Sequence, residues 1–224
     1  MRIRILRGRE FLSHTMPARA PISFVLFATL TFVAACSGSN SPNSPSVVEP
    51  SGSAIHDTLN AGTSVNLDGV YSEHWFSEDR RVWDDFTTGK AGAIRTIAWQ
   101  GIRRTAVAPA AFNIQITEDN AAPGTSAFYE AKYPIGQVNE HLDGTQACSN
   151  LPQQQCGLYS YSIALPTTVS VKGGTKYWLL VQGEAPSDSL SSGWLWRNGQ
   201  RDNGFARISI ANTFLTWDLA FAIR

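Results

Sequence analysis

The sequence is poor in the residues from which catalytic and metal sites are most often built. It contains three Cys and four His among 224 residues, and charged side chains make up 16% of the chain. It has no G-x-S-x-G elbow, no H-E-x-x-H motif and no phosphate-binding glycine loop. Ser, His and Asp are all present, so a triad assembled in space stays open. We predict that the chain is not an enzyme, with a hydrolase of unfamiliar type as the weakest alternative.

The N-terminal region has no apolar run long enough to cross a bilayer as a helix. Residues 22–35 form an apolar run of fourteen residues, whereas a spanning helix needs about 20. Five Arg and a single Glu precede this run. Basic residues followed by a short apolar core are typical of a secretory signal peptide. Residues 1–35 are therefore predicted to be a signal peptide, with Met16 as a second candidate for the true start.

The signal region ends in Val33-Ala34-Ala35-Cys36. This segment resembles the lipobox of bacterial lipoproteins, in which an aliphatic residue and two small residues precede an invariant Cys. The resemblance implies that Cys36 is acylated and becomes the first residue of the mature chain; an ordinary signal peptide with an incidental Cys is the alternative. Ser37 in place of Asp points to the outer membrane by the sorting habit of enteric bacteria, and the leaflet stays open. We expect a lipid-anchored protein of the cell envelope, on the periplasmic or outer-surface side.

Composition divides the rest of the chain into a tether and one domain. Residues 36–54 begin with the lipidated Cys, and residues 37–53 hold seven Ser and three Pro. Such a segment is predicted to hold the domain about 20–25 Å from the lipid. Residues 55–224 are long enough for a single domain with its own core.

The charge of the mature chain argues against a nucleic-acid partner. The whole sequence has 18 basic and 18 acidic residues, and residues 1–35 account for five Arg and one Glu. The mature part therefore has 13 basic and 17 acidic residues. This net charge of about −4 lacks the excess of Lys and Arg that phosphates require.

Alternation of apolar and polar residues predicts strands throughout residues 55–224. It covers 112–117, 159–165 and 215–223, as expected for strands with one face on a core. Residues 175–182 are apolar on both faces and predict a central strand, and the K-G-G-T turn at 172–175 predicts a tight hairpin. No amphipathic helical run is present. The pattern predicts an all-β fold, namely an antiparallel, jelly-roll-like β-sandwich.

Two cysteines remain after Cys36 is assigned to lipid. Cys148 and Cys156 are separated by seven residues in a chain predicted to be exported to an oxidising compartment. We predict that they form a disulfide that pins a surface loop. Two free thiols or an intermolecular bond are the alternatives, and two thiols alone are a poor metal site.

Five phrases together resemble a known domain of bacterial secreted and surface-anchored proteins. They are WDDF at 83–86, FNIQITEDNAAPG at 112–124, LPTTVSVKGGTKYWLLVQG at 165–183, WLWRNG at 194–199 and DLAFAI at 218–223. Many proteins with this domain carry a PEP-CTERM-type sorting tail, whereas this chain has the lipobox-like segment. The resemblance implies a β-sandwich and an anchored location. It implies no ligand, because the family has no assigned activity.

Acidic residues suggest a structural calcium site. Asp85 could join Asp218, or Glu118 and Asp119, around a Ca²⁺ ion, which takes six to eight oxygen ligands. Asp84 should point to the opposite face of its strand unless the strand bends. The favoured alternative is that these carboxylates cap turns and form ion pairs with Arg95, Arg103 or Arg104. No other cofactor is expected.

A second polar cluster comprises Glu73, His74, Glu78 and Asp79. A zinc site built on one His with unspaced acids is conceivable. A solvated loop is the favoured interpretation, since the segment shows no clean periodicity.

Aromatic residues carry the main binding hypothesis. Trp194 and Trp196 share one strand face, and if that face is exposed they form a stacking platform for sugar rings beside Arg197 and Asn198. Core packing of the pair is the favoured alternative, because a sandwich of this size needs Trp in its core. Trp217 is expected in the core because it belongs to the alternating row at 215–223.

These observations favour a lipid-anchored extracytoplasmic binding module, with carbohydrate or glycan as its ligand class. The alternative is a structural or adhesive surface protein that contacts other proteins and has no small ligand. Exposure of Trp194 and Trp196 separates the two, because a buried pair cannot serve as a platform.

Overall fold

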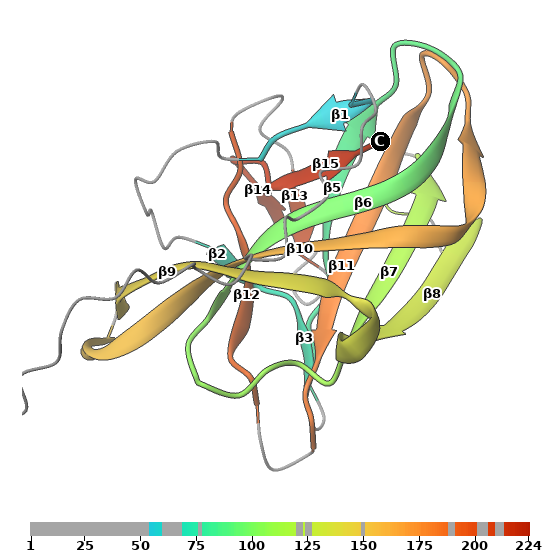
Figure 1. Cartoon of the computed structure of the whole chain (residues 1–224). Coiled ribbons are helices and arrows are strands. Elements are labelled where there is room, and N and C mark those ends of the chain that lie inside the picture. The colour runs from blue at the N-terminus through green and yellow to red at the C-terminus, as the bar shows by residue number, and fades with distance from the viewer. Residues whose placement is uncertain are drawn as a thin grey trace, which may run out of the picture. The chain divides into compact units, whose positions relative to one another are not determined.

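The computed structural model describes residues 54–59, 69–75, 78–119, 123, 127–148, 151–187, 191–200, 206–208 and 213–224 (Figure 1). All of these lie within one compact unit, residues 47–224. The predicted signal peptide, Cys36 and the tether lie outside the described residues and stay predictions. Within the described part, no helix has the length and apolar character needed to cross a membrane.

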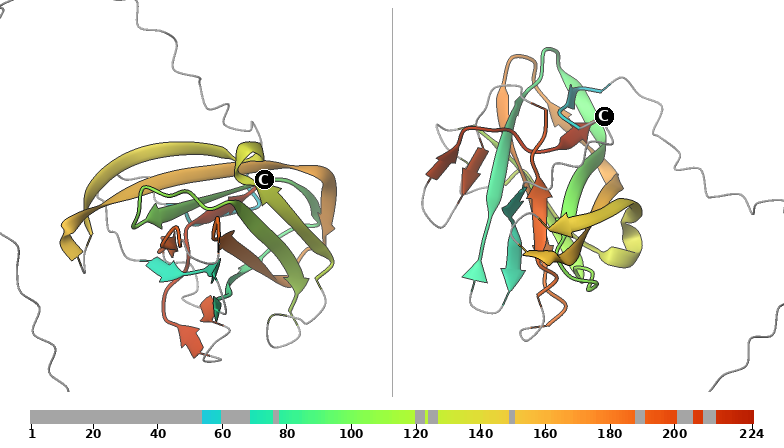
Figure 2. Two further views of the ribbon diagram at one scale, coloured as in Figure 1. Left: turned by 90° about the horizontal axis from the view of Figure 1, so that it is seen from below. Right: turned by 90° about the vertical axis from the view of Figure 1, so that its left-hand side faces the viewer.

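The described residues form two packed β-sheets, which confirms the predicted all-β sandwich (Figures 1 and 2). One sheet contains β1 (His56–Asp57), β2 (Gly69–Tyr71), β6 (Gly92–Arg103), β9 (Asn139–Cys148), β10 (Leu151–Val171), β12 (Trp194–Arg197) and β15 (Phe221–Ile223). The other contains β3 (Glu73–Trp75), β4 (Glu78–Asp79), β5 (Val82–Thr87), β7 (Ala111–Glu118), β8 (Tyr129–Pro134), β11 (Lys176–Glu184), β13 (Ala206–Ile208) and β14 (Thr213–Leu215). The pairs are antiparallel except that β3 runs parallel to β11.

Each sheet is organised around one long strand. β6 pairs along one edge with β10, and along the other edge first with β15 and then with β12. β11 pairs along one edge with β7, and along the other with β5 and then β3. A short 3₁₀ turn, η1 (Ile135–Gln137), connects β8 in the second sheet to β9 in the first. The short strands beside β6 and β11 bring distant parts of the sequence together.

The predicted strand patterns are confirmed in β7 and β11. Phe112, Ile114 and Ile116 of β7 are fully buried, and β11 is buried on both faces apart from its two ends. The predicted hairpin at Lys172–Thr175 is wrong. A turn occurs there, with Gly174 at φ 69°, but β10 and β11 do not pair with each other because the turn carries the chain from one sheet to the other.

The C-terminal alternation also fails, since Asp218, Ala220 and Ala222 of the expected solvent-facing row are buried. Leu219, Phe221 and Ile223 are fully buried, whereas Trp217 is 41% exposed. β14 ends at Leu215, and the chain bends at 216–217 before it reaches β15. The prediction that Trp217 lies in the core is therefore wrong, because the bend interrupts the strand period.

An aromatic cluster joins the two sheets in the core. The rings of Trp99 and Tyr161 stack with centroids 5.5 Å apart, and both belong to the first sheet. Phe112 from the second sheet meets Trp99 and Trp194 edge-on, each at 5.1 Å. Gly101 makes room for Trp194, since a Cβ at this position would lie 2.3 Å from the indole nitrogen. Edge-on ring pairs of this kind add to the stabilisation from burial.

Cys148 and Cys156 form the predicted disulfide. The bond links β9 to β10, and both cysteines are buried against Ile102 and Leu158. Much of the seven-residue segment between the cysteines belongs to β10 rather than to a loop, since that strand begins at Leu151. The disulfide therefore closes the end of a long β9–β10 hairpin.

Candidate functional site

Trp194 and Trp196 are fully buried. Trp194 packs against Phe112, and Trp196 lies edge-on to Phe221 with centroids 6.0 Å apart. The indole nitrogen of Trp196 donates to the backbone oxygen of Ala220 at 3.1 Å. The prediction of an exposed sugar-stacking platform at this pair is therefore wrong. A sandwich core must fill a wide space between two sheets, and the large rings on this face of β12 fill it.

The polar neighbours of the pair are also engaged within the fold. Arg197 is 2% exposed and donates to Gln100 Oε1 at 2.9 Å. Burial lowers the pKa of Arg197, because it removes the charged form from water. Asn198 forms a backbone bridge with Leu219. These residues hold β12 against its neighbours and do not rim a sugar site.

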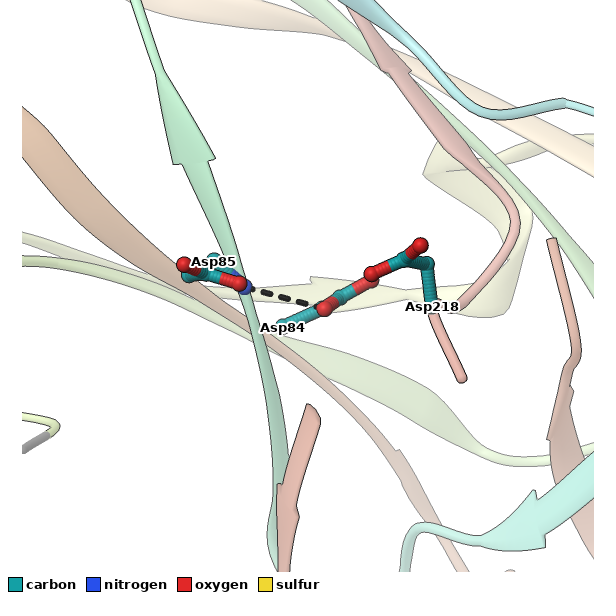
Figure 3. A group of neighbouring side chains, drawn as sticks. All are labelled: Asp84, Asp85 and Asp218. Atoms are coloured by element: carbon teal, nitrogen blue, oxygen red, sulfur yellow. Dashed lines mark hydrogen bonds between the residues drawn. The ribbon is translucent and has the colours of Figure 1, made fainter. Parts of the chain in front are cut away.

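Three carboxylates meet between β5 and the chain that leads into β15 (Figure 3). Asp84, Asp85 and Asp218 each offer an oxygen, and these oxygens lie within 4.8 Å of one another. All three residues are buried. Figure 3 shows that the Asp84 side chain points toward Asp218. The predicted association of Asp85 with Asp218 occurs, and Asp84 belongs to the same group.

The other two predicted calcium ligands do not belong to this group. Glu118 forms an ion pair with Lys172 at 3.2 Å, and Asp119 accepts a hydrogen bond from the indole nitrogen of Trp178 at 2.8 Å. The predicted alternative in which Asp85 joins Glu118 and Asp119 is therefore wrong, whereas the predicted grouping of Asp85 with Asp218 is found. Asp85 does form an ion pair, but with Lys176 at 2.6 Å rather than with one of the predicted arginines.

Burial of Asp84 favours a proton on its carboxyl group, although two backbone N–H donors favour the charged form. One carboxylate oxygen accepts from the backbone N–H of Asp85 at 3.0 Å, and the other accepts from that of Leu219 at 2.6 Å. Burial raises the pKa of Asp84 well above its usual value, and the charges of Asp218 and Asp85 raise it further. A cation would have to compete with these bonds and with Lys176.

We expect the stability of the protein to depend on pH through Asp84. The folded state binds this proton more tightly than the unfolded chain, whose Asp pKa is about 3.8. The contribution of this proton to the free energy of unfolding is therefore fully present below the unfolded pKa. It is lost as the pH rises through the higher pKa of the folded state. Asp84→Asn cannot ionise, so its stability relative to the wild type should improve from pH 4 to pH 8. Urea denaturation at pH 4, 6 and 8 measures this, and a pH-independent difference would contradict it.

A pocket of about 280 Å³ lies elsewhere, beside the short strands β2, β3 and β4. Its lining residues are Tyr71, Glu73, Glu78, Arg80 and Ser191. We call it the Tyr71 pocket. Two strand pairings bring Ser191 next to the other lining residues. β2 pairs with β12, and β3 pairs with the end of β11.

Glu73 forms the buried wall of the Tyr71 pocket and is 4% exposed. One carboxylate oxygen accepts from the backbone N–H of Ser192 at 2.9 Å and from its hydroxyl at 2.5 Å. The other oxygen accepts from the Ser191 hydroxyl at 2.6 Å. The turn that follows has Gly193 at φ 61°, a conformation that glycine tolerates best. Glu73 therefore fixes this turn against β3.

Arginines flank the Tyr71 ring. The guanidinium carbons of Arg80 and Arg104 lie 5.5 and 5.6 Å from the ring centroid, and Arg104 donates to the Tyr71 hydroxyl. Arg80 also forms an ion pair with Glu78 at 2.6 Å. The pocket thus combines an aromatic ring with donors and acceptors of both charge signs.

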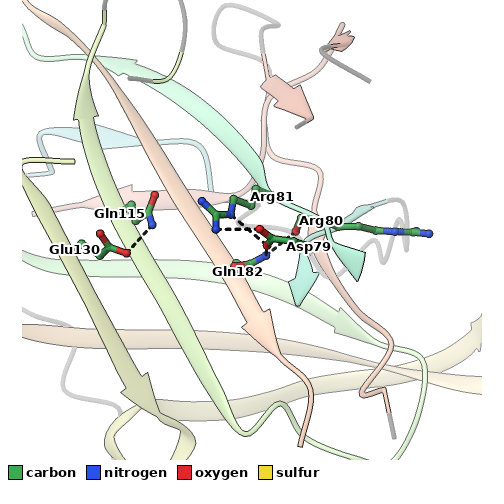
Figure 4. Close-up of polar contacts among 6 residues, drawn as sticks. All are labelled: Asp79, Arg80, Arg81, Gln115, Glu130 and Gln182. Atoms are coloured by element: carbon green, nitrogen blue, oxygen red, sulfur yellow. Dashed lines mark hydrogen bonds and ion pairs between the residues drawn. The ribbon is translucent and has the colours of Figure 1, made fainter. Parts of the chain in front are cut away.

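The backbone that carries Arg80 is held by β11 (Figure 4). The buried amide of Gln182 donates to Asp79 Oδ1 at 2.8 Å and to the backbone oxygen of Arg80 at 3.0 Å. Asp79 also forms an ion pair with Arg81 at 2.9 Å. These contacts with β11 hold the backbone of Arg80 in place, and a binding site requires such support from a rigid element.

The interpretation of Glu73, His74, Glu78 and Asp79 as a solvated cluster is therefore correct only in part. His74 and Asp79 do face each other as a pair between β3 and β4 and are exposed. The prediction of a loop is wrong, because all four residues lie on β3 and β4. Glu73 is also buried and so is not solvated. Its serine partners are more than 110 residues away along the chain, and no local pattern reveals them.

No protein-family model matches this chain, and no curated protein matches it. The resemblance to the domain of secreted and surface-anchored proteins therefore stays a prediction.

Proposed function

We propose that this chain is a lipid-anchored, extracytoplasmic binding module that holds one sugar ring of a carbohydrate in the Tyr71 pocket. The observation that carries the proposal is the pocket itself, with its volume of about 280 Å³ and its mixed aromatic and polar lining. Ligand pockets usually measure about 300–1,000 Å³. The Tyr71 pocket lies just below this range, where a single ring fits better than a long ligand.

The charges around the pocket favour a neutral ligand with hydroxyl groups. An anion would meet Glu73 and Glu78, and a cation would meet Arg80. Sugar hydroxyls can donate to a carboxylate and accept from a guanidinium, so they use both signs at once. Tyr71 adds apolar surface for the carbon-bound hydrogens of a sugar ring.

The sequence supports the location of this module. The lipobox-like segment before Cys36 and the Ser- and Pro-rich residues 37–53 fit a lipid anchor followed by a tether. The buried Cys148–Cys156 disulfide fits an oxidising compartment outside the cytoplasm. A lipid anchor would keep the pocket near the envelope surface, where glycans are abundant.

Glu78→Gln should weaken glycan binding by about 10- to 100-fold, because hydrogen bonds to a charged group contribute about 1.5–3 kcal/mol. Binding is measured on an array of defined mono- and oligosaccharides with residues 37–224, which retain every described element of the fold. Glu130→Gln serves as the matched control. Glu130 is also exposed, but it lies on β8 and accepts from Gln115 at 2.9 Å, away from the pocket (Figure 4).

Wild-type binding that is lost in Glu78→Gln and kept in Glu130→Gln supports the proposal. An array without any hit for the wild type would overturn the carbohydrate assignment and favour the assembly role, in which the sandwich contacts another protein. Equal binding by both variants would place the site outside the pocket.

A further inference from the structure

The two residues that follow β6 connect this strand to the Tyr71 pocket. The backbone N–H of Arg104 donates to the backbone oxygen of Gly193 at 3.3 Å. The hydroxyl of Thr105 donates to the backbone oxygen of Ser192 at 2.9 Å. Both contacts reach the turn that supplies Ser191 to the lining of the pocket. The end of β6 therefore helps to fix one side of the pocket.

The side chain of Arg104 also holds the aromatic ring of the pocket. Its guanidinium donates to the Tyr71 hydroxyl, and the guanidinium carbon lies 5.6 Å from the ring centroid. Rotation about the first side-chain bond of a tyrosine moves its hydroxyl, so this hydrogen bond fixes the direction in which the ring points. Arg104 is not among the described residues that line the pocket. It therefore acts on a ligand through Tyr71.

Gln154 supports the backbone of Arg104 from β10. Its half-buried side-chain amide donates to the backbone oxygen of Arg104. β10 is irregular at this point, because Leu151 pairs with Cys148 of β9 whereas Gln155 pairs with the residue before that cysteine. The three residues between these two pairs form a bulge, and Gln154 is the last of them. The bulge places the Gln154 side chain beside the end of β6.

The disulfide closes this bulge. Cys148 and Cys156 flank Gln154 in the sequence and are bonded to each other. They are 3% and 2% exposed, so the bond is sheltered from reductants in solution. Without it, the bulge would be held to β9 only by backbone hydrogen bonds at a strand end, where local opening is easiest. The position of Gln154 therefore depends on the disulfide.

We propose that Gln154 is a positioning residue for the Tyr71 pocket and that the Cys148–Cys156 disulfide holds it in place. The Gln154 amide fixes the backbone of Arg104, and Arg104 fixes both the Tyr71 ring and the neighbouring turn. The disulfide then serves ligand binding as well as stability. This inference rests on the proposed function, because it takes the Tyr71 pocket as the place where the ligand is held.

Gln154→Glu tests the positioning role, because a carboxylate has nearly the shape of the amide but cannot donate a hydrogen bond. Residues 37–224 are labelled with carbon-13 in their tyrosines, and Tyr71→Phe identifies the Tyr71 ring resonance. In Gln154→Glu this resonance should shift in the absence of any ligand. Titration with D-glucose, D-galactose, D-mannose and N-acetyl-D-glucosamine should show binding weakened by about 10-fold.

Two further variants separate the hydrogen bond from the change of charge. Gln154→Lys restores a donor and should recover most of the binding. Gln155→Glu is the matched control, since Gln155 is the next residue and is exposed. It should keep the wild-type Tyr71 resonance and the wild-type affinity.

Replacement of both cysteines by serine tests the role of the disulfide. The variant with Cys148→Ser and Cys156→Ser should shift the Tyr71 resonance and weaken binding as Gln154→Glu does. Gln154→Glu should then add little in that background, because both changes act through one contact. Additive effects would overturn the role of the disulfide. Gln154→Glu itself retains the bond, so its result does not depend on the folding of the serine variant.

An unchanged Tyr71 resonance in Gln154→Glu would overturn the inference, and so would equal effects of Gln154→Glu and Gln155→Glu. A wild type that binds none of the four sugars overturns the sugar assignment of the proposed function. The Tyr71 resonance of the unliganded protein still tests, in that case, whether Gln154 positions the ring.

Discussion

Replacing Trp194 with alanine should lower the free energy of unfolding by about 3–5 kcal/mol, the range for large aromatic side chains removed from a core. Trp194 is fully buried and meets Phe112 and Tyr161 edge-on, at 5.1 and 6.5 Å. Its loss would leave a cavity between the sheets that the strands cannot easily close. Urea denaturation followed by circular dichroism measures the change.

Trp217→Ala is the matched comparison, because the same residue type is changed at an exposed position. It should alter the free energy of unfolding by about 0.5 kcal/mol or less, since exposed substitutions away from special features have small effects. Comparable losses in the two variants would contradict the assignment of Trp194 to the core and of Trp217 to the surface.

Glu73→Ala should have the second-largest effect on stability, about 2–4 kcal/mol, and should also abolish binding in the Tyr71 pocket. The substitution removes an acceptor that takes three hydrogen bonds from Ser191 and Ser192, and it leaves a buried backbone N–H without a partner. The turn at residues 191–193 would lose its position against β3. Denaturation and glycan binding are measured on the same preparation.

Glu73→Gln separates the two roles of this side chain. Glutamine keeps one oxygen for Ser192 and can rebuild part of the network, so both stability and binding should recover in part. We assign Glu73 a positioning role for the pocket. Full stability together with lost binding in Glu73→Gln would contradict that role and indicate direct ligand contact through the negative charge.

The sandwich was predictable from local sequence because alternation is a local property. Phe112, Ile114 and Ile116 identify the buried face of β7 without knowledge of any other strand. The same rule misplaced Trp217, since a bend at 216–217 changes the face and leaves the composition unchanged. Alternation could not decide whether Trp194 and Trp196 are buried or exposed, because a strand face with two tryptophans suits either a core or a binding surface.

The Tyr71 pocket was not predictable from the sequence. Its lining joins Tyr71 and Arg80 to Ser191, and this association requires the pairing of β2 with β12 and of β3 with β11. The Lys172–Thr175 turn shows the same limit, because a turn sequence does not specify whether the next strand joins the same sheet. Asp84 belongs to one cluster with its neighbour Asp85, although successive strand residues normally face opposite sides.

Saturation-transfer difference NMR tests the proposed sugar site most directly. Residues 37–224 are mixed with D-glucose, D-galactose, D-mannose and N-acetyl-D-glucosamine, and the protein is irradiated at its methyl resonances. The account predicts transfer to the ring protons of at least one sugar with the wild type and loss of that transfer with Tyr71→Ala. No transfer to any of the four sugars, or equal transfer with both proteins, would contradict the assignment of the Tyr71 pocket as a sugar-binding site.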